Sequence, residues 1–254
     1  LERHLGQALF KRKGRGVELT LPGRLLHESV ARSFEVIRYG LERLETYLDP
    51  DLITLVCPAA VCQGWLQPRI SALTQAHPAL KPIICIDETV RYVDEMDVDI
   101  TITREPLRQK GLQEVLLFDD SLCVVATPVL AARWQALPVQ ERTKLAGLLC
   151  LETDLSAPLA GPFIRTQLAA LRKAAIYDDA RLLLDAAKRG HGLALVSTLL
   201  AQEAMSTGEL VRLSAYEPVP VGKVWMARRA GEPRSPLVHA VFDSLQAMAT
   251  QPLH

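Results

Sequence analysis

The sequence predicts an α/β fold in two similar halves, preceded by a long helix and a short basic β-structure. From Leu52 onward, short apolar strands alternate with helices, and the same alternation starts again after residue 127. Connections that cross over through a helix are typical of a largely parallel sheet. The third observation is a stretch without proline from residue 23 to residue 48, which predicts a single long helix.

The composition limits the classes of protein to which the chain can belong. Its 29 Lys and Arg residues balance its 29 Asp and Glu residues, which argues against coating nucleic acid through bulk charge. No apolar run reaches the roughly 18 residues that a membrane span needs. The sequence as given does not open on a charged and then apolar stretch, so we expect a cytoplasmic protein without a membrane partner. The five cysteines lack the spacing of a disulfide framework or a zinc site. We expect reduced thiols, no metal and no cofactor, and leave open a redox role for Cys57 and Cys62.

Residues 1–22 predict the end of a helix followed by a small basic wing. Leu1, Leu5 and Leu9 are spaced by four, as on one face of a helix, and a short alternating strand runs from Val17 to Thr20. KRKGRG lies between these two segments, although the whole chain is neutral. We expect this local positive charge to form a small contact surface; the alternative is a solvated basic loop.

A heptad seam runs along the long helix, which we place with its hinge at residues 23–50. Thr20 can cap this helix, and Pro22 suits its first turn. The apolar positions of the seam alternate steps of four and three, as in a coiled coil: Val30, Phe34, Ile37, Leu41, Leu44 and Leu48. The narrow stripe favours dimerisation, and packing on the chain's own domain is the alternative. Asp49-Pro50-Asp51 should end the helix.

The two halves differ in how the chain contributes to them. Residues 51–126 and 222–254 should form the first half, and residues 127–221 the second. The strands of the first half are expected at 52–57, 83–86, 98–103, 115–118, 122–126 and 223–227. Those of the second half are expected at 148–151, 174–177, 193–196 and 210–213. Helices are expected over 58–76, 163–173, 178–190, 197–208 and 235–248, with a short helix between the strands at 83–86 and 98–103.

Motifs of common enzyme classes do not occur in the sequence. There is no GxSxG, HExxH or P-loop. GHG at residues 190–192 follows a helix and precedes a strand, which is the wrong order for a dinucleotide-binding loop. The histidines are dispersed, and we expect His77, before Pro78, to be structural. The sequence therefore does not predict an enzyme.

The pattern LExxLGxxLFxRxxRxVxLTxxG occupies residues 1–23. It resembles the second part of the winged helix-turn-helix of LysR-type transcriptional regulators, and the long helix resembles that family's linker helix. WLQPRISALTQAHPAL resembles the first helix of the family's effector-binding domain, especially in the branch of the glycine-cleavage activator. AAKRGHGLALVSTLL resembles its Gly-x-Gly turn, strand and helix. The family's first DNA-binding helices have no counterpart here, so we expect a DNA-binding domain truncated at its N-terminus.

The resemblance implies a DNA-binding regulator with two Rossmann-like subdomains, arranged as in periplasmic binding proteins. It implies a double-stranded DNA operator, a small-molecule effector, a homodimer that assembles into a tetramer, and contact with RNA polymerase. Arg12 and Arg15 match the family's basic wing positions, and Lys11 and Lys13 add charge; all four should contact phosphate, which sets register rather than sequence choice. The alternative is a stand-alone periplasmic-type solute-binding protein, which shares the two-lobed plan.

The effector should lie between the halves, beyond the carboxyl ends of the parallel strands. The residues expected to contact it each follow a strand: Pro58, Ala59, Thr89, Thr103, Thr127, Thr153, Tyr177, Asp178 and Ser197, with Asp87, Glu88, Arg104, Glu152 and Asp154 beside them. Pro58 and Ala59 begin a helix whose free N–H groups favour an anion. Helix capping is the alternative for Thr89, Asp178 and Ser197, and a surface pair with Glu105 is the alternative for Arg104.

Overall fold

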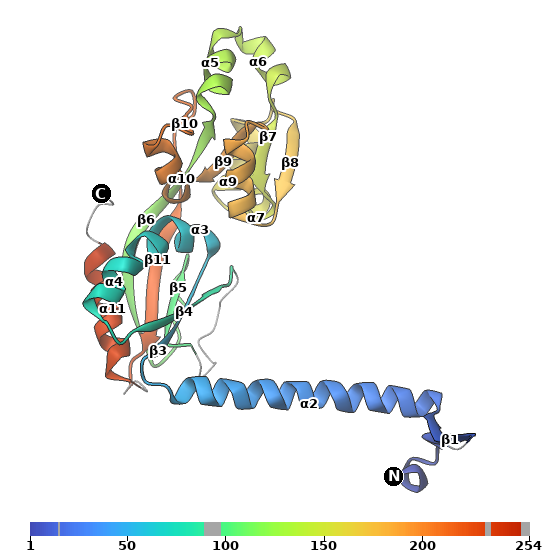
Figure 1. Ribbon diagram of the computed structural model, residues 1–254. Helices are drawn as coiled ribbons and strands as arrows, with labels where there is room; N and C mark the ends of the chain where they lie inside the picture. The colour runs from blue at the N-terminus through green and yellow to red at the C-terminus, as the bar shows by residue number, and fades with distance from the viewer. Residues whose placement is uncertain (15, 89–97, 232–234, 250–254) are drawn as a thin grey trace. The chain divides into compact units, whose positions relative to one another are not determined.

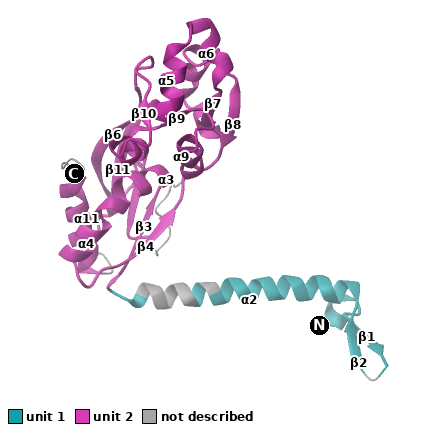
Figure 2. Ribbon diagram, turned by 45° about the horizontal axis from the view of Figure 1, so that its top comes forward, with its two compact units in different colours: residues 1–50 teal, residues 51–254 magenta. Residues whose placement is uncertain are grey.

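The computed structural model describes residues 1–14, 16–88, 98–231 and 235–249, without the side chains of residues 39 and 42–47. The chain forms two compact units, residues 1–50 and residues 51–254 (Figure 2). The expected helix after the second strand, with Thr89, lies outside the described residues, and so does Arg15. Each unit is described by itself below.

The first unit is a β-hairpin joined to a long helix (Figure 1). Its elements are α1 (Glu2–Leu5), β1 (Phe10–Lys13), β2 (Gly16–Leu19) and α2 (Leu21–Leu48). Gly6 adopts the left-handed conformation, with φ 65°, and ends α1 after a single turn. β1 and β2 pair antiparallel, with Lys11 opposite Glu18. The basic segment is thus a two-stranded wing, as the sequence predicts. The sequence did not predict its first strand, β1.

Short polar contacts tie the wing to the start of α2. The Thr20 hydroxyl donates to the carbonyl of Ala8 at 2.6 Å and accepts from the amide of Gly23 at 3.2 Å, so Thr20 caps α2 as predicted. The Glu2 carboxylate accepts the amide of Leu9 at 2.6 Å. A Cβ at Gly23 would lie 2.0 Å from the Leu9 carbonyl oxygen, so only glycine permits this close approach of helix and wing.

The second unit is built on one mixed sheet with the strand order β4-β3-β5-β11-β6-β9-β7-β8, and β10 pairs with β6. The strands are β3 (Leu52–Cys57), β4 (Lys81–Ile86), β5 (Ile100–Thr103), β6 (Leu112–Ala126), β7 (Leu148–Leu151), β8 (Lys173–Tyr177), β9 (Leu193–Ser197), β10 (Val211–Arg212) and β11 (Val219–Arg229). Pairing is parallel among β4, β3 and β5 and among β8, β7 and β9. The two long strands β6 and β11 are antiparallel to their neighbours. The expected parallel sheet is therefore divided into two parallel parts by an antiparallel centre.

Helices cover this sheet on both lobes. They are α3 (Ala59–Val61), the π-helix η1 (Cys62–Leu66), the short 3₁₀-helix η2 (Gln67–Arg69), α4 (Ile70–Ala76), α5 (Pro128–Ala136), α6 (Val139–Leu145), α7 (Glu152–Ser156), α8 (Ala160–Thr166), α9 (Ala180–Lys188), α10 (Thr198–Ser206) and α11 (Pro236–Ala249). In Figure 1, α4 and α11 lie together against the lobe of β3, β4 and β5, which we call lobe I. The lobe of β7, β8 and β9, with α5 to α10, is lobe II.

The hydrophobic cores change from one lobe to the other along β6 and β11. Leu117 and Val224 belong to the core of lobe I, which Ile53, Leu55 and Phe242 also fill. Leu122 is part of a core of lobe II, and Val221 packs against the same core. The sequence places the corresponding crossings at 126/127 and 221/222, and those subdomain boundaries stay a prediction.

Three expectations about local structure are wrong. The strands expected at 115–118 and 122–126 are one continuous strand, because β11 pairs with β6 from Leu122 back to Leu112. The helix expected over 163–173 ends at Thr166, and Lys173 begins β8. The cap of α9 is Asp179, whose carboxylate accepts the amide of Arg181 at 2.8 Å, and not Asp178.

Candidate functional site

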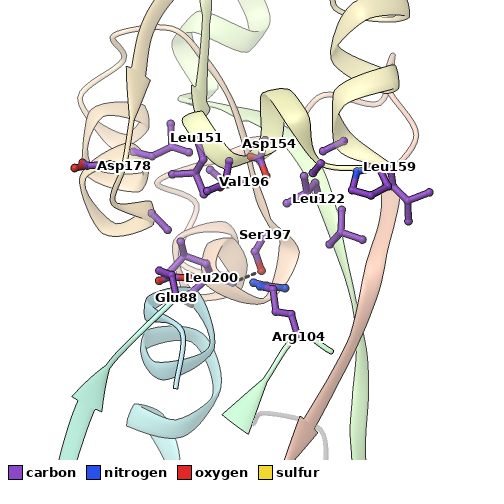
Figure 3. A pocket seen from close by; sticks show the side chains of 18 of the residues that line it. Glu88, Arg104, Leu122, Leu151, Asp154, Leu159, Asp178, Val196, Ser197 and Leu200 are labelled. Carbon is purple, nitrogen blue, oxygen red and sulfur yellow. Dashed lines mark hydrogen bonds between the residues drawn. The ribbon is translucent and has the colours of Figure 1, made fainter. Parts of the chain in front are cut away.

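A cavity of about 450 Å³ lies in the second unit, beyond the carboxyl ends of strands from both lobes. Lobe I contributes the segments after β4 and β5, and lobe II contributes those after β7, β8 and β9 (Figure 3). Most of its lining is apolar: Ala60, Leu122, Leu151, Ala157, Pro158, Leu159, Ala160, Ala180, Leu183, Val196, Leu200 and Val221. An open α/β sheet places its ligands at this edge.

The charges that line this cavity are mainly negative. Four acidic residues and one basic residue are among its lining: Glu88, Glu105, Asp154, Asp178 and Arg104. Asp178 and Leu159 lie on opposite sides of the cavity in Figure 3. The side chain of Asp178 is exposed at the rim, whereas Asp154 is largely buried.

Arg104 is already engaged by a buried carboxylate. Its Nη1 donates to Asp120 at 2.8 Å, and the Ser197 hydroxyl donates to the same carboxylate at 2.9 Å. The amide of Ser121 donates to the other oxygen at 2.8 Å. Arg104 therefore pairs with Asp120. The pair with Glu105, which the sequence analysis gave as the alternative, is not the one formed. Ser197 also caps α10, since its Oγ accepts the amide of Leu200.

The first amide of α3, where the sequence predicts room for an anion, has a partner within the protein. The N–H of Ala59 donates to Glu88 Oε1 at 2.7 Å. The amide therefore is not free, and the carboxylate of Glu88 stands where an anionic group was expected. Two residues placed 29 positions apart make this contact, so no local sequence pattern could have revealed it.

Asp154 has one buried carboxylate oxygen, Oδ2, without a hydrogen-bond partner among the described residues. Burial raises the pKa of Asp154 to about 6, against the smaller opposing effects of a backbone hydrogen bond and of the Arg104 charge. A buried acceptor without a donor costs free energy, so a donor from a bound molecule would stabilise it.

Three of the nine expected contact residues line the cavity: Thr153, Asp178 and Ser197. Five lie elsewhere, and Thr89 is outside the described residues. Pro58 and Ala59 lie at the N-terminus of α3, and of this helix Ala60 lines the cavity. Thr127 caps α5, and Tyr177 packs against a core of lobe II. Thr103 is buried and donates its hydroxyl to the carbonyl of Glu105 at 2.7 Å. As contacts of an effector, all nine stay predictions.

The sequence reading missed the stretch 157–160, which forms one wall of the cavity. It placed no element between the strand at 148–151 and a helix at 163, whereas α7 and α8 occupy this region. The signal available was Pro158, which separates two short helical segments. Leu122 was also missed, because it was assigned only to the expected strand at 122–126.

A second cavity of about 600 Å³ lies away from the strand ends, between η1, α9 and α10. Its polar lining consists mainly of amides and hydroxyls, such as Gln63, Gln67, Gln202 and Ser206, with Lys188 and Glu203. It is larger, but it is not framed by the ends of strands from both lobes. We therefore treat the first cavity as the candidate site and the second as its rival.

The cations of the wing lie on both faces of the hairpin. Successive side chains of a strand point to opposite faces, so Lys11 and Lys13 share one face and Arg12 points from the other. Glu18 pairs with Lys11 at 3.8 Å and with Lys13 at 2.5 Å. All three cations of β1 are exposed.

The seam of α2 is exposed within the described chain. Val30, Phe34, Ile37, Leu41 and Leu48 are between 43% and 77% exposed, and the side chain of Leu44 lies outside the described residues. Apolar side chains in a row of this length need a partner surface. The first unit itself does not supply that surface to the described seam residues.

None of the five cysteines, all of which lie in the described part of the chain, forms a disulfide. A hydrogen bond with Cys57 lowers the pKa of Cys62 to about 7.

Across the described parts of the chain, no group of three His, Cys, Asp or Glu side chains could hold a metal ion. None of the described helices combines the length and the apolar character that crossing a membrane requires.

A two-lobed α/β domain with its cavity at the strand ends, joined to a long helix and a basic wing, defines a ligand-responsive DNA-binding regulator. The family described as "LysR substrate binding domain" matches residues 49–250. The chain therefore belongs to the LysR family of transcriptional regulators, and the resemblance seen in the sequence is confirmed. The reading as a stand-alone solute-binding protein is not favoured by these matches.

Individual relatives agree with this assignment. The chain is 28% identical to the HTH-type transcriptional activator AmpR of Pseudomonas aeruginosa over 229 residues, covering 90% of this chain and 76% of the relative. It is 26% identical to the glycine cleavage system transcriptional activator of Escherichia coli, covering 83% and 69%. The solved effector domain of AmpR from Pseudomonas aeruginosa has the same fold, with a TM-score of 0.61 at 22% identity, covering 79% of this chain and 95% of that structure.

Proposed function

We propose that the 450 Å³ cavity is the effector site of this regulator and that its occupancy changes how closely lobes I and II approach each other. The observation that carries this proposal is the origin of the lining: segments after β4 and β5 face segments after β7, β8 and β9. A ligand that touches both sides stabilises one arrangement of the lobes over another. The shift cannot exceed the difference between its affinities for the two arrangements.

The crossing strands are suited to act as a hinge. The β6–β11 register slips between Pro220 and Gly222, so that Val221 is a bulge opposite Asp120 and Ser121. Gly222 has φ 130°, which other residues rarely adopt. Bulges disrupt the ladder locally and increase the twist. Because Val221 also lines the cavity, a ligand can act directly on the bulge.

We further propose that α2 pairs with α2 of a second copy and that the wing contacts DNA phosphate. The exposed seam supports the dimer, and Arg12, Lys11, Lys13 and Arg15 supply the positive charge. A two-fold dimer suits a near-palindromic operator. On the basis of family membership, we also propose assembly into a tetramer, contact with RNA polymerase and a cytoplasmic location. The chain acts as a sensor and not as an enzyme, because its matched relatives are transcriptional regulators.

A ligand screen with a blocked cavity tests the effector site. Metabolites are screened by thermal shift on the full chain, since a ligand at a hundred times its Kd stabilises the folded state by about 2.7 kcal/mol. Ala157→Trp places a large side chain in the cavity wall, and Ala132→Trp, on the exposed face of α5, is the matched control. The stabilisation should vanish in Ala157→Trp and persist in Ala132→Trp. A ligand whose effect is equal in both variants contradicts the proposed site.

A further inference from the structure

We infer that the effector carries a positively charged group, an ammonium or a guanidinium, on an apolar body, and that Asp154 is the partner of that group. This inference rests on the proposed role of the cavity as the effector site. It names the class of molecule that the cavity takes and the residue that selects it.

The first reason is the local environment of Asp154. Its Oδ2 is buried at the cavity and lacks a hydrogen-bond partner among the described residues. The pKa of about 6 lies below neutral pH, so the group is mostly ionised there despite its burial. An ionised carboxylate accepts hydrogen bonds and donates none, which means that its missing partner is a donor. A charged donor gives the strongest such bond.

The second reason is that the one cation of the described lining is paired with another residue. Arg104 Nη1 lies 2.8 Å from Asp120, whose side chain is only 2% exposed. The positive charge of Arg104 lowers the pKa of Asp154 less than burial raises it. Arg104 therefore does not fully offset the effect of burial on Asp154, and Glu88 and Glu105 add two further acidic residues to the lining.

The third reason is that two donors near the cavity already have acceptors within the protein. The amide of Ala59 is bonded to Glu88, and the hydroxyl of Ser197 donates to Asp120. An anionic group of a ligand would be repelled by the negative charges of Glu88 and Glu105, which also line the cavity. The apolar side chains of the lining, such as Leu122 and Val221, can contact the apolar body of the ligand but not its charged group.

Three compounds that share one alkyl chain test the inference: hexylamine, hexanol and hexanoate. Each is titrated into the full chain by calorimetry near neutral pH. Hexylamine should bind at least about tenfold more tightly than hexanol or hexanoate, the ratio expected for one charge-assisted hydrogen bond. Asp154→Asn should reduce this preference to less than about threefold, since the amide keeps the shape and loses the charge.

Asp119→Asn is the matched control, because it removes the same formal charge from an exposed side chain that does not line the cavity. It should leave the preference for the amine nearly unchanged. If Asp154→Asn does not fold, the ranking of the three compounds on the unmodified chain decides alone. Hexanol or hexanoate binding as well as the amine overturns the inference, as does an amine that does not bind or a preference that survives in Asp154→Asn.

The failure of this inference differs from a failure of the effector site. Hexanol or hexanoate that binds to the unmodified chain and not to Ala157→Trp leaves the cavity as the effector site and removes only its preference for cations. Binding of any of the three compounds that is equal in Ala157→Trp and Ala132→Trp removes the site itself.

Discussion

Arg104 reaches from the end of β5 to Asp120 in the middle of β6, with 2.8 Å between guanidinium nitrogen and carboxylate oxygen. Asp120 also receives the Ser197 hydroxyl from the end of β9 and the Ser121 amide from its own strand. One carboxylate thus joins both lobes at the level where β6 passes from one core to the other. Any movement of the lobes has to keep or replace these bonds.

Removing this carboxylate should destabilise the second unit strongly. Asp120→Ala leaves the partly buried Arg104 and the buried Ser197 without their acceptor, which costs about 3 kcal/mol. The neighbouring Asp119→Ala should cost less than about 0.5 kcal/mol, because that side chain is 77% exposed and lies 3.9 Å from Lys223. Urea unfolding of the two variants measures the difference. Equal losses of unfolding free energy in the two variants would show that the hydrogen bonds of Asp120 do not stabilise the second unit.

Asp154→Asn should stabilise the unliganded chain above about pH 6. Burial raises the folded-state pKa of Asp154 from 3.8 to about 6, so the folded state binds this proton more tightly than the unfolded state. The stability contributed by the group is therefore full below about pH 4 and is lost as the pH rises to about 6. Asn does not ionise and avoids a loss of about 3 kcal/mol.

Urea unfolding of both chains at about pH 4 and about pH 7.5 measures this effect. The advantage of Asp154→Asn should be small at the lower pH and full at the higher pH. A constant difference at the two values would mean that the carboxylate of Asp154 does not titrate as its burial requires.

Charge on the seam of α2 should dissociate the proposed dimer. Phe34→Glu places a carboxylate where a second α2 would pack, and Val36→Glu places one a helical step away from the seam. The two native side chains are similarly exposed, at 66% and 71%, so the variants differ mainly in position. Sedimentation velocity should show a monomer for Phe34→Glu and an unchanged dimer for Val36→Glu. Equal behaviour of the two variants contradicts the seam.

Loss of a wing cation should weaken binding to every DNA sequence alike. Arg12→Ala removes one phosphate contact, which should lower the slope of log K against log salt by about one. Arg133→Ala, on the exposed side of α5, is the control and should change nothing. Fluorescence anisotropy on two unrelated duplexes measures both variants. A loss confined to one duplex would assign Arg12 to base recognition and contradict the proposed phosphate contact.

The sequence predicts those parts of the fold that local chemistry determines. Thr20 caps α2, and the helix ends at Leu48 before Asp49-Pro50. Ser197 caps α10. Each of these features depends on residues within a few positions, so a single sequence reveals them.

The sequence does not reveal features that distant residues determine. Asp119-Asp120-Ser121 reads as a break between two strands, yet β6 continues through it because Arg104 and Ser197 satisfy Asp120 and β11 supplies the ladder. The carboxylate of Glu88 accepts a hydrogen bond from the amide of Ala59, which lies 29 residues earlier in the chain. The strand-end rule pointed to the edge of the sheet at which the cavity lies, but its wall at 157–160 depends on how α7 and α8 pack.

Hydrogen exchange on the full chain, with and without the first stabilising ligand, tests the central claim most directly. If the cavity between the lobes is the effector site, exchange should slow in residues 104–105, 152–160 and 196–197, which contribute to its lining. Protection confined to residues 63–68 and 202–206 would place the ligand in the second cavity and contradict the account.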